Sequence, residues 1–155
     1  MEQLFFRQAT RSDGAEVLAL VQSVLEEYGL EVDSATTDAD LHDIEASYIE
    51  RGGWFEVLVA SDGKIVGSGG LMFIDESTCE LRKMYLVPEV RGHGWGKKML
   101  VRFLKKAEIL GFQRVTLETA TVLVEALKLY TQFGFQPFTP DHMSCRCDLA
   151  YELWL

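Results

Sequence analysis

The chain has 155 residues, 48% of them hydrophobic and 25% charged, and it carries a formal net charge of −9. That length and composition predict one domain, residues 1–155, with a sizeable hydrophobic core. The acidic balance argues against a nucleic-acid partner, because neutralising a phosphate backbone requires a broad basic face. No stretch approaches the ~20 apolar residues that span a bilayer. We therefore expect no membrane partner. The three cysteines are odd in number and poorly spread for a disulfide framework, which predicts a reducing, cytoplasmic setting.

The N-terminal third predicts one strand and two helices. Residues 4–9 have strand composition, and Thr10 with Asp13 forms a capping-box pattern that begins a helix. Apolar residues then recur at helical spacing until a glycine ends the pattern, at Val17, Leu20, Val21, Val24, Leu25 and Tyr28. A second helix is predicted from about Asp38 to Gly52.

The rest of the chain predicts hairpins followed by alternating strands and helices. Asp62-Gly63 is a hairpin turn signal, and glycines at 67, 69 and 70 predict a bulge or a closely packed group. The predicted elements are strands at 54–60, 64–74 and 81–87, a helix to about 110, a strand at 114–119, a helix at 124–133, and strands at 135–138 and 145–154. This order predicts an α+β fold with one central mixed sheet.

A glycine-rich turn lies between the predicted strand at 81–87 and the helix after it. Gly92, Gly94 and Gly96 fall within five residues, and glycine allows left-handed backbone and the close approach of a ligand. The first N–H groups of the helix have no partner within it and, with the helix dipole, favour a phosphate at this point. The turn therefore predicts a site for a phosphate-bearing ligand.

Positive charge is concentrated around the same turn. Residues 82–106 hold one acid, Glu89, and eight basic residues, which are Arg82, Lys83, Arg91, Lys97, Lys98, Arg102, Lys105 and Lys106. The segment therefore carries +7 within a chain of −9, which leaves −16 for the remainder. A polyanionic ligand is expected to bind here.

The turn and a downstream segment together resemble a known family. Arg91-x-x-Gly94-x-Gly96 is similar to the acyl-CoA-binding signature of the GNAT superfamily of N-acetyltransferases. The segment Ala-Leu-Lys-Leu-Tyr-Thr-Gln-Phe-Gly-Phe at 126–135 resembles that family's Ala-x-x-x-Tyr-x-x-x-Gly-Phe pattern. The resemblance implies an α+β, GNAT-like fold, with a central mixed, mostly antiparallel sheet flanked by about four helices.

The resemblance also implies an activity and a set of site residues. An acetyl group would move from acetyl-CoA to a primary amine of a small molecule, by direct transfer in a ternary complex and without a metal. The backbone N–H of Met84 would stabilise the oxyanion, and Tyr85 and Leu86 would pair with the pantetheine amides. The CoA pyrophosphate would bind at the turn formed by Arg91, Gly92, His93, Gly94, Trp95, Gly96 and Lys97.

Two side chains are candidates for proton transfer. Glu80 lies eleven residues before Arg91, which is the offset of the catalytic glutamate in the histone-acetyltransferase branch of the family, and a half-buried carboxylate suits a general base. Its alternative role is an ion pair with Arg82 on the same strand face. Tyr130 is the candidate general acid for the departing thiolate, with core packing as its alternative role. Leu123 stands where many family members have an Asn that contacts the cofactor, so CoA binding is expected to depend more on the turn.

Other interpretations are open. A non-catalytic, CoA-binding regulatory module and an acetyltransferase for peptide or protein amines are two of them. A dinucleotide-binding fingerprint would use Gly92-x-Gly94, but its third glycine position is Lys97. A covalent acyl-enzyme on Cys79 is disfavoured, because strand alternation points this thiol away from Glu80. No closed zinc pattern fits His142, Cys145 and Cys147.

The acceptor is expected to be cationic. Between Ser12 and Glu50 there is no Lys or Arg but there are eleven acids, namely Asp13, Glu16, Glu26, Glu27, Glu31, Asp33, Asp38, Asp40, Asp43, Glu45 and Glu50. In GNAT-like chains this region walls the acceptor side of the cleft, so its charge would attract a cationic amine. The alternative is a solvated helix face. Family members are often dimers, which leaves a homodimer open.

Overall fold

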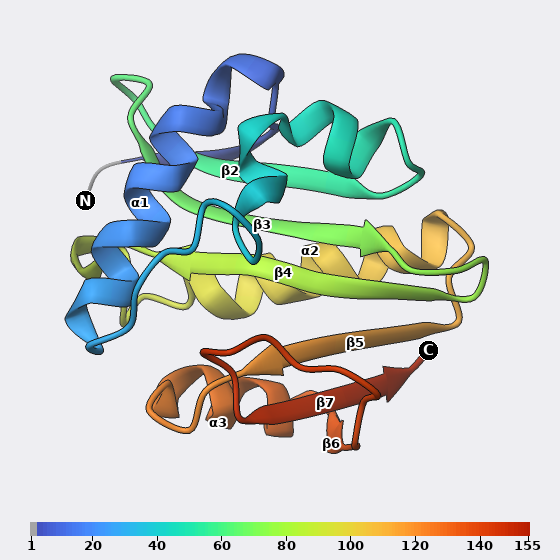
Figure 1. Ribbon diagram of the computed structural model, residues 1–155. Coiled ribbons are helices and arrows are strands. Elements are labelled where there is room, and N and C mark those ends of the chain that lie inside the picture. The colour runs from blue at the N-terminus through green and yellow to red at the C-terminus, as the bar shows by residue number, and fades with distance from the viewer. Residues whose placement is uncertain (1–2) are drawn as a thin grey trace.

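Strand-forming stretches in residues 3–155, the part of the chain that this computed structural model describes, make one seven-stranded sheet (Figure 1). The strands are β1 (Leu4–Gln8), β2 (Trp54–Ala60), β3 (Ile65–Phe73), β4 (Thr78–Leu86), β5 (Arg114–Thr119), β6 (Gln136–Pro137) and β7 (Leu149–Trp154). Their spatial order is β1-β2-β3-β4-β5-β7-β6. Every neighbouring pair is antiparallel except β4 and β5, which run parallel. The predicted α+β fold is confirmed.

Helices cover both faces of the sheet (Figure 1). The α-helices are α1 (Gly14–Glu27), α2 (Trp95–Ile109) and α3 (Val124–Gln132). Shorter 3₁₀ turns lie at Arg11–Asp13, Ala39–His42 and Pro88–Val90, and a π-helical turn lies at Glu45–Ile49. Figure 1 shows α1 and the turns after it on one face, and α2 and α3 on the other.

Strand alternation divides the core between these two faces. In β2, Phe55 and Val57 pack with the α1 side, whereas Leu58 packs with the α2 side. Glycines allow α2 to lie close to β3, since a Cβ added at Gly69 would lie only 2.5 Å from the Phe103 ring. The prediction that another group lies close to the glycines of this strand is confirmed.

A bulge interrupts β4 near its centre. The β3–β4 register shifts between Ser68 and Gly70, so Lys83 and Met84 lie opposite a single residue of β3. Lys83 has a left-handed φ of 58°, which is uncommon for a residue other than glycine. Its carbonyl accepts a hydrogen bond of 2.7 Å from the Ser68 hydroxyl, which holds the bulge in place.

The parallel pairing of β4 with β5 is short. It joins residues 78–80 of β4 to residues 114–116 of β5 and then ends. Residues 81–86 of β4 therefore have no strand partner on the β5 side. Backbone N–H and C=O groups on that edge are available to a ligand because the facing strand does not use them, except the Leu86 carbonyl, which accepts hydrogen bonds from Arg91.

The predicted helix from Asp38 to Gly52 is wrong as a continuous element. The backbone at Asp43 is extended, with φ −150° and ψ 93°, and separates the 3₁₀ turn from the π-helical turn. The Asp43 carboxylate accepts a 3.1 Å hydrogen bond from the Ala46 N–H, so a side chain competes with helix continuation. Three apolar side chains of this segment are nevertheless buried, namely Leu41, Ile44 and Tyr48.

The last strand is shorter than predicted. It begins at Leu149 rather than at Cys145. The Cys147 N–H donates to the Ser144 carbonyl at 3.1 Å and closes a turn instead. The Asp148 carboxylate accepts a hydrogen bond from the Thr121 N–H at 2.8 Å, which fixes the loop before β7 against the start of α3.

Candidate active site

A cavity of about 330 Å³ opens where β4 and β5 separate. Residues 80–86 of β4, the last two residues of β5 and Ala120 after it are part of its lining. One side comes from the glycine turn and α3, with Gly92, Gly94, Trp95, Gly96, Leu123, Ala126, Leu129 and Tyr130. The opposite side comes from α1, the connection after it and the loop before β7, with Tyr28, Leu30, Thr37, Ser144, Arg146 and Cys147.

The structure brings most of the predicted site residues into this one cavity. Those that line it are Glu80, Met84, Tyr85, Leu86, Arg91, Gly92, Gly94, Trp95, Gly96 and Tyr130. His93 and Lys97 do not line it, and both are exposed.

The glycine turn has the geometry of an anion-binding site. Gly92 and Gly94 have left-handed φ values of 81° and 84°, and α2 begins directly afterwards at Trp95. A Cβ added at either glycine would meet no atom within 4 Å, so the space beside the turn is open. The Lys98 N–H donates to the Gly94 carbonyl at 3.1 Å and starts the helical pattern, which leaves the preceding N–H groups for a ligand. These features fit a phosphate group.

The Arg91 side chain is already engaged within the chain. Its two terminal nitrogens each donate a 2.9 Å hydrogen bond to the carboxylate of Glu27 on α1. Its Nε and Nη2 also donate to the Leu86 carbonyl at 3.0 and 2.8 Å. The hydrogen bond with Glu27 raises the pKa of Arg91. Arg91 therefore holds the turn against α1 and the end of β4.

Glu80 occupies the last position of β4 that pairs with β5. Burial raises the pKa of its carboxyl, the nearby charge of Glu118 adds to the rise, and Arg82 opposes it. The Arg82 Nε lies 3.3 Å from Glu80 Oε1, so the expected ion pair exists beside the perturbed carboxyl. Cys79 is fully buried in the core on the α2 side, as predicted, and burial raises the pKa of its thiol to about 12.

Tyr130 combines a core position with access to the cavity. Its side chain is buried, and its ring packs against Phe135 with the centroids 5.8 Å apart. Burial raises the pKa of its phenol, so the hydroxyl keeps its proton at neutral pH. Leu123 lines the same cavity where α3 begins, at the position where the family pattern has Asn.

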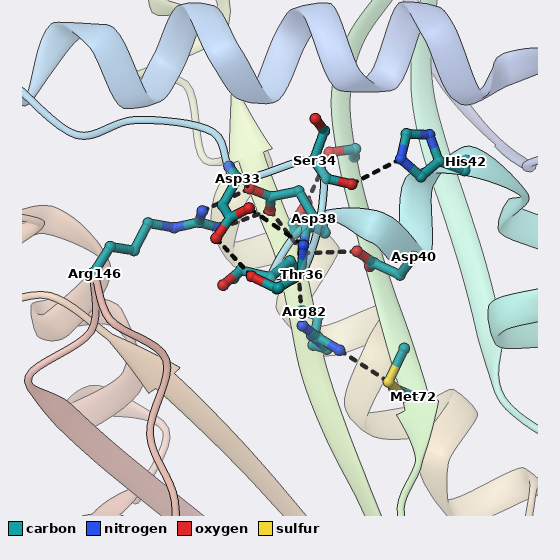
Figure 2. Close-up of polar contacts among 12 residues, drawn as sticks. Asp33, Ser34, Thr36, Asp38, Asp40, His42, Met72, Arg82 and Arg146 are labelled. Atoms are coloured by element: carbon teal, nitrogen blue, oxygen red, sulfur yellow. Dashed lines mark hydrogen bonds and ion pairs between the residues drawn. The ribbon is translucent and has the colours of Figure 1, made fainter.

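A cluster of buried charges joins the segments on the other side of the cavity (Figure 2). The Arg146 guanidinium donates two hydrogen bonds of 2.7 Å to the fully buried carboxylate of Asp38. The Lys83 Nζ lies 3.1 Å from the same carboxylate. Burial alone would raise the pKa of Asp38, but hydrogen bonds from Arg146 and the Asp33 N–H, with the charge of Lys83, lower it to about 2.

The same cluster reaches the strand face beside Glu80. The Lys83 Nζ also lies 3.2 Å from Asp40 Oδ1, and Tyr48 donates a hydrogen bond to the other Asp40 oxygen. Arg82 donates to the Thr37 carbonyl at 3.1 Å (Figure 2). The cluster therefore links the connection after α1, the β4 bulge and the loop before β7. The sequence analysis missed it, although a lysine in a largely apolar strand was a signal.

Most acids between Ser12 and Glu50 have partners within the chain. Arg7 pairs with Asp13, and Arg11 pairs with Asp43, Glu45 and Glu50. Glu27 and Asp38 pair with Arg91 and Arg146. None of the eleven acids, all of which the structure describes, lines a cavity of the site. The predicted acidic wall is therefore not a free surface facing the acceptor.

A second cavity of about 380 Å³ adjoins the first. It lies against β4 and β5, and the segment after β6 lines its other side with Phe138, Thr139, Pro140, Asp141 and His142. Glu80 and Glu118 line both cavities. We call the border between the two cavities at these two carboxylates the passage.

Two further observations concern metals and membranes. Among residues 3–155, no group of three or more His, Cys, Asp or Glu side chains lies close enough together to hold a metal ion. Within the same range, no helix is both long and apolar enough to cross a bilayer.

Comparisons with known proteins agree with this geometry. Residues 18–135 match the Acetyltransferase (GNAT) family. The chain is 33% identical to the uncharacterized N-acetyltransferase YjgM of Escherichia coli (strain K12), over 95% of this chain and 93% of that protein. A GNAT-family acetyltransferase structure from Staphylococcus aureus Mu50 superposes with a TM-score of 0.90 at 23% identity, over 97% and 98% of the two chains. Spermidine N-acetyltransferase from Vibrio cholerae, solved with CoA and spermine, superposes with a TM-score of 0.70 at 19% identity, over 99% and 95%.

The fold, the opening between β4 and β5 and these matches define an acetyl-CoA-dependent acyltransferase. The chain belongs to the GNAT family of acetyltransferases. The resemblance drawn from the two sequence motifs is therefore confirmed.

Proposed function

We propose that this protein transfers the acetyl group of acetyl-CoA to a primary amine of a small molecule, while both substrates are bound. One observation carries the proposal. A single cavity is lined by an open glycine turn at a helix N-terminus, a free edge of β4 and a half-buried carboxyl with a raised pKa. These are the elements that direct acetyl transfer requires. The proposal treats residues 1–155 as one catalytic domain.

Acetyl-CoA would bind from the glycine turn toward β4. The first N–H groups of α2, with Gly92 and Gly94, would hold the pyrophosphate. The free edge of β4 at Tyr85 and Leu86 would pair with the pantetheine amides. The backbone N–H of Met84, at the bulge, would then donate to the carbonyl oxygen as negative charge develops there. Because backbone N–H groups would hold the pyrophosphate, the Arg91 side chain can serve the site by holding the turn in place.

Glu80 and Tyr130 would move the protons. An amine arrives as an ammonium ion, and Glu80 would take one proton from it directly or through water. The neutral nitrogen forms a bond to the acetyl carbon, the carbon–sulfur bond breaks, and its electron pair leaves on sulfur. Tyr130 would protonate the thiolate and regain a proton from the acetylated nitrogen. The proton held by Glu80 returns to solvent.

The acceptor would occupy the second cavity and present its amine at the passage. Its volume of about 380 Å³ suits a small molecule and is within the usual range of ligand pockets. The wall on the β6 side is formed by a loop of this chain, which favours a small acceptor over an extended peptide. The spermine-bound structural neighbour shows an amine in a protein of the same fold.

The test is a coupled pair of measurements on the full chain. Acetyl-CoA should raise the melting temperature, because it binds the native state. Mixtures of acetyl-CoA with small primary amines should release free CoA thiol above the rate without amine. A thermal shift without amine-dependent thiol release would contradict the enzymatic proposal and support a regulatory CoA-binding module. Turnover on peptide amines alone would contradict the small-molecule acceptor.

A further inference from the structure

The passage is bordered by two carboxylates from different strands. Glu80 is the last residue of β4 that pairs with β5, opposite Thr116. Glu118 lies two residues beyond Thr116, so strand alternation places both β5 side chains on the same face of the sheet. Glu80 and Glu118 are the two residues, within the described chain, that line both cavities. The border between the two cavities therefore lies at these two carboxylates.

Glu118 differs from Glu80 in its partners. Glu80 has Arg82 at 3.3 Å. Glu118 Oε1 accepts a 2.9 Å hydrogen bond from the Ser144 N–H, and among the described residues no Lys or Arg forms an ion pair with its carboxylate. The side chain is half-buried. The charge of Glu118 contributes to the raised pKa of Arg82, so this guanidinium is nearby, although it forms no ion pair with Glu118. The Glu118 carboxylate is therefore able to bind a cation from a ligand in competition with Arg82.

The charges of the second cavity favour a cation in the same way. Its lining includes Asp141 in addition to the two glutamates. Its basic residues are Arg114 and His142, and Arg114 already donates a 2.8 Å hydrogen bond to Glu152. Phe138 covers the Arg114 guanidinium, which lies 4.9 Å from the ring centroid. The cavity therefore offers carboxylates to an incoming molecule, and its one arginine is already paired.

We propose that Glu118 binds the ammonium group of the acceptor at the passage and presents it to Glu80. The inference rests on the proposed acetyltransferase function. It assigns the acceptor to cationic amines that carry no carboxylate beside the amine. A carboxylate on the acceptor would be repelled by the like charges of Glu80, Glu118 and Asp141. The cationic acceptor expected from the sequence is thus proposed again, but on three residues outside the stretch from Ser12 to Glu50.

The proposal also predicts a pH effect through Glu80. Its carboxyl is influenced by burial and by the charges of Arg82, Glu118, Lys83 and Asp40. Removing the negative charge of Glu118 takes away a contribution that raises the pKa of Glu80. The pKa of Glu80 then falls, and its basic form is present at lower pH. The acid limb of kcat/KM should therefore move to lower pH.

The experiment compares the wild type with Glu118→Gln. The amide oxygen of Gln retains an acceptor for the Ser144 N–H and removes only the charge. Acceptors are matched pairs that differ by one carboxylate, namely histamine with histidine, agmatine with arginine, and cadaverine with lysine. In Glu118→Gln, KM for the decarboxylated amines should rise by about 10-fold, whereas KM for acetyl-CoA stays unchanged. The preference for the decarboxylated member of each pair should shrink.

A surface variant controls for net charge. Glu108→Gln, on the exposed face near the end of α2, removes the same charge away from both cavities and should keep wild-type constants. An unchanged amine KM and an unchanged acid limb in Glu118→Gln would overturn the inference. A parallel rise in the acetyl-CoA KM would also overturn it, by showing a general distortion. A wild type that releases thiol with other small primary amines but with none of the six compounds would overturn the inference alone, whereas a wild type that releases thiol with no primary amine would overturn the proposed function.

Discussion

Asp38→Asn should destabilise the protein by an amount that depends on pH. The variant keeps the shape of the side chain and removes the charge that Arg146 and Lys83 share. Removing one partner of a buried ion pair costs about 3–5 kcal/mol. Lys83 retains Asp40 at 3.2 Å, and the Arg146 side chain is 14% exposed and can reach water. We therefore expect the free energy of unfolding to fall by about 3 kcal/mol, at the lower end of this range.

The pKa of Asp38 gives an independent magnitude and fixes the sign. Folding lowers this pKa from 3.8 to about 2, so the carboxylate stabilises the native state above pH 3.8, and this contribution is lost as pH falls through the folded value. At about 1.4 kcal/mol per pH unit, the full contribution at neutral pH is about 2.5 kcal/mol. The linkage relation predicts that about 1 kcal/mol of this contribution to the free energy of unfolding is lost between pH 6 and pH 3. The cost of breaking the ion pair and the contribution obtained from the pKa of Asp38 are therefore of the same size.

Urea unfolding followed by tryptophan fluorescence measures this effect. At pH 7 the variant should unfold with about 3 kcal/mol less free energy, equivalent to a melting temperature lower by about 6–12 °C. The difference from the wild type should narrow by about 1 kcal/mol at pH 3. Glu108→Gln, as a surface control, should follow the wild type at both pH values. A difference that is absent, or that stays constant with pH, would refute the assignment of Asp38 as the charged centre of the cluster.

Three further changes test the remaining assignments. Gly94→Val should abolish the thermal shift by acetyl-CoA, because φ is 84° there and the added side chain fills the space kept for phosphate; an unchanged shift would remove the turn from the binding site. Tyr130→Phe should lower turnover by about 10²-fold with little change in the acetyl-CoA KM; wild-type turnover would assign the phenol to core packing. Glu80→Gln should lower kcat by about 10²–10⁴-fold and abolish the acid limb of the pH profile. In the wild type this limb should lie above pH 4.5, the ordinary pKa of a glutamate carboxyl, because burial raises the pKa of Glu80. Matching pH profiles of the variant and the wild type would show that another group is the base.

The sequence predictions that were confirmed rested on patterns among neighbouring residues. The bounds of β2 and β5 match the predicted residues 54–60 and 114–119, because strand alternation and turn residues are properties of neighbouring positions. The glycine turn was predicted for the same reason. The helix across residues 38–52 failed where the Asp43 carboxylate bonded to the backbone, which apolar periodicity does not register.

The sequence alone did not predict which residues far apart in the chain pair with each other. Arg91 was assigned to the ligand by its motif, yet Glu27, from a different element, binds its guanidinium. Lys83 meets Asp38 only because β4 bulges beneath the connection after α1. The importance of Glu118 depends on the separation of β4 from β5, which no local pattern encodes. Charges in a sequence can be counted, but the structure decides which of them are neutralised.

The short pairing between β4 and β5 gives the two edges of β4 different protection from hydrogen exchange. Amides directed at β3 are bonded in a long antiparallel ladder and should exchange only on large-scale unfolding. Amides of residues 81–86 directed at β5 lack that partner and should exchange rapidly. A ligand that pairs with this edge would slow the second group and leave the first unchanged. Deuterium uptake along one strand would thus separate ligand binding from global stabilisation.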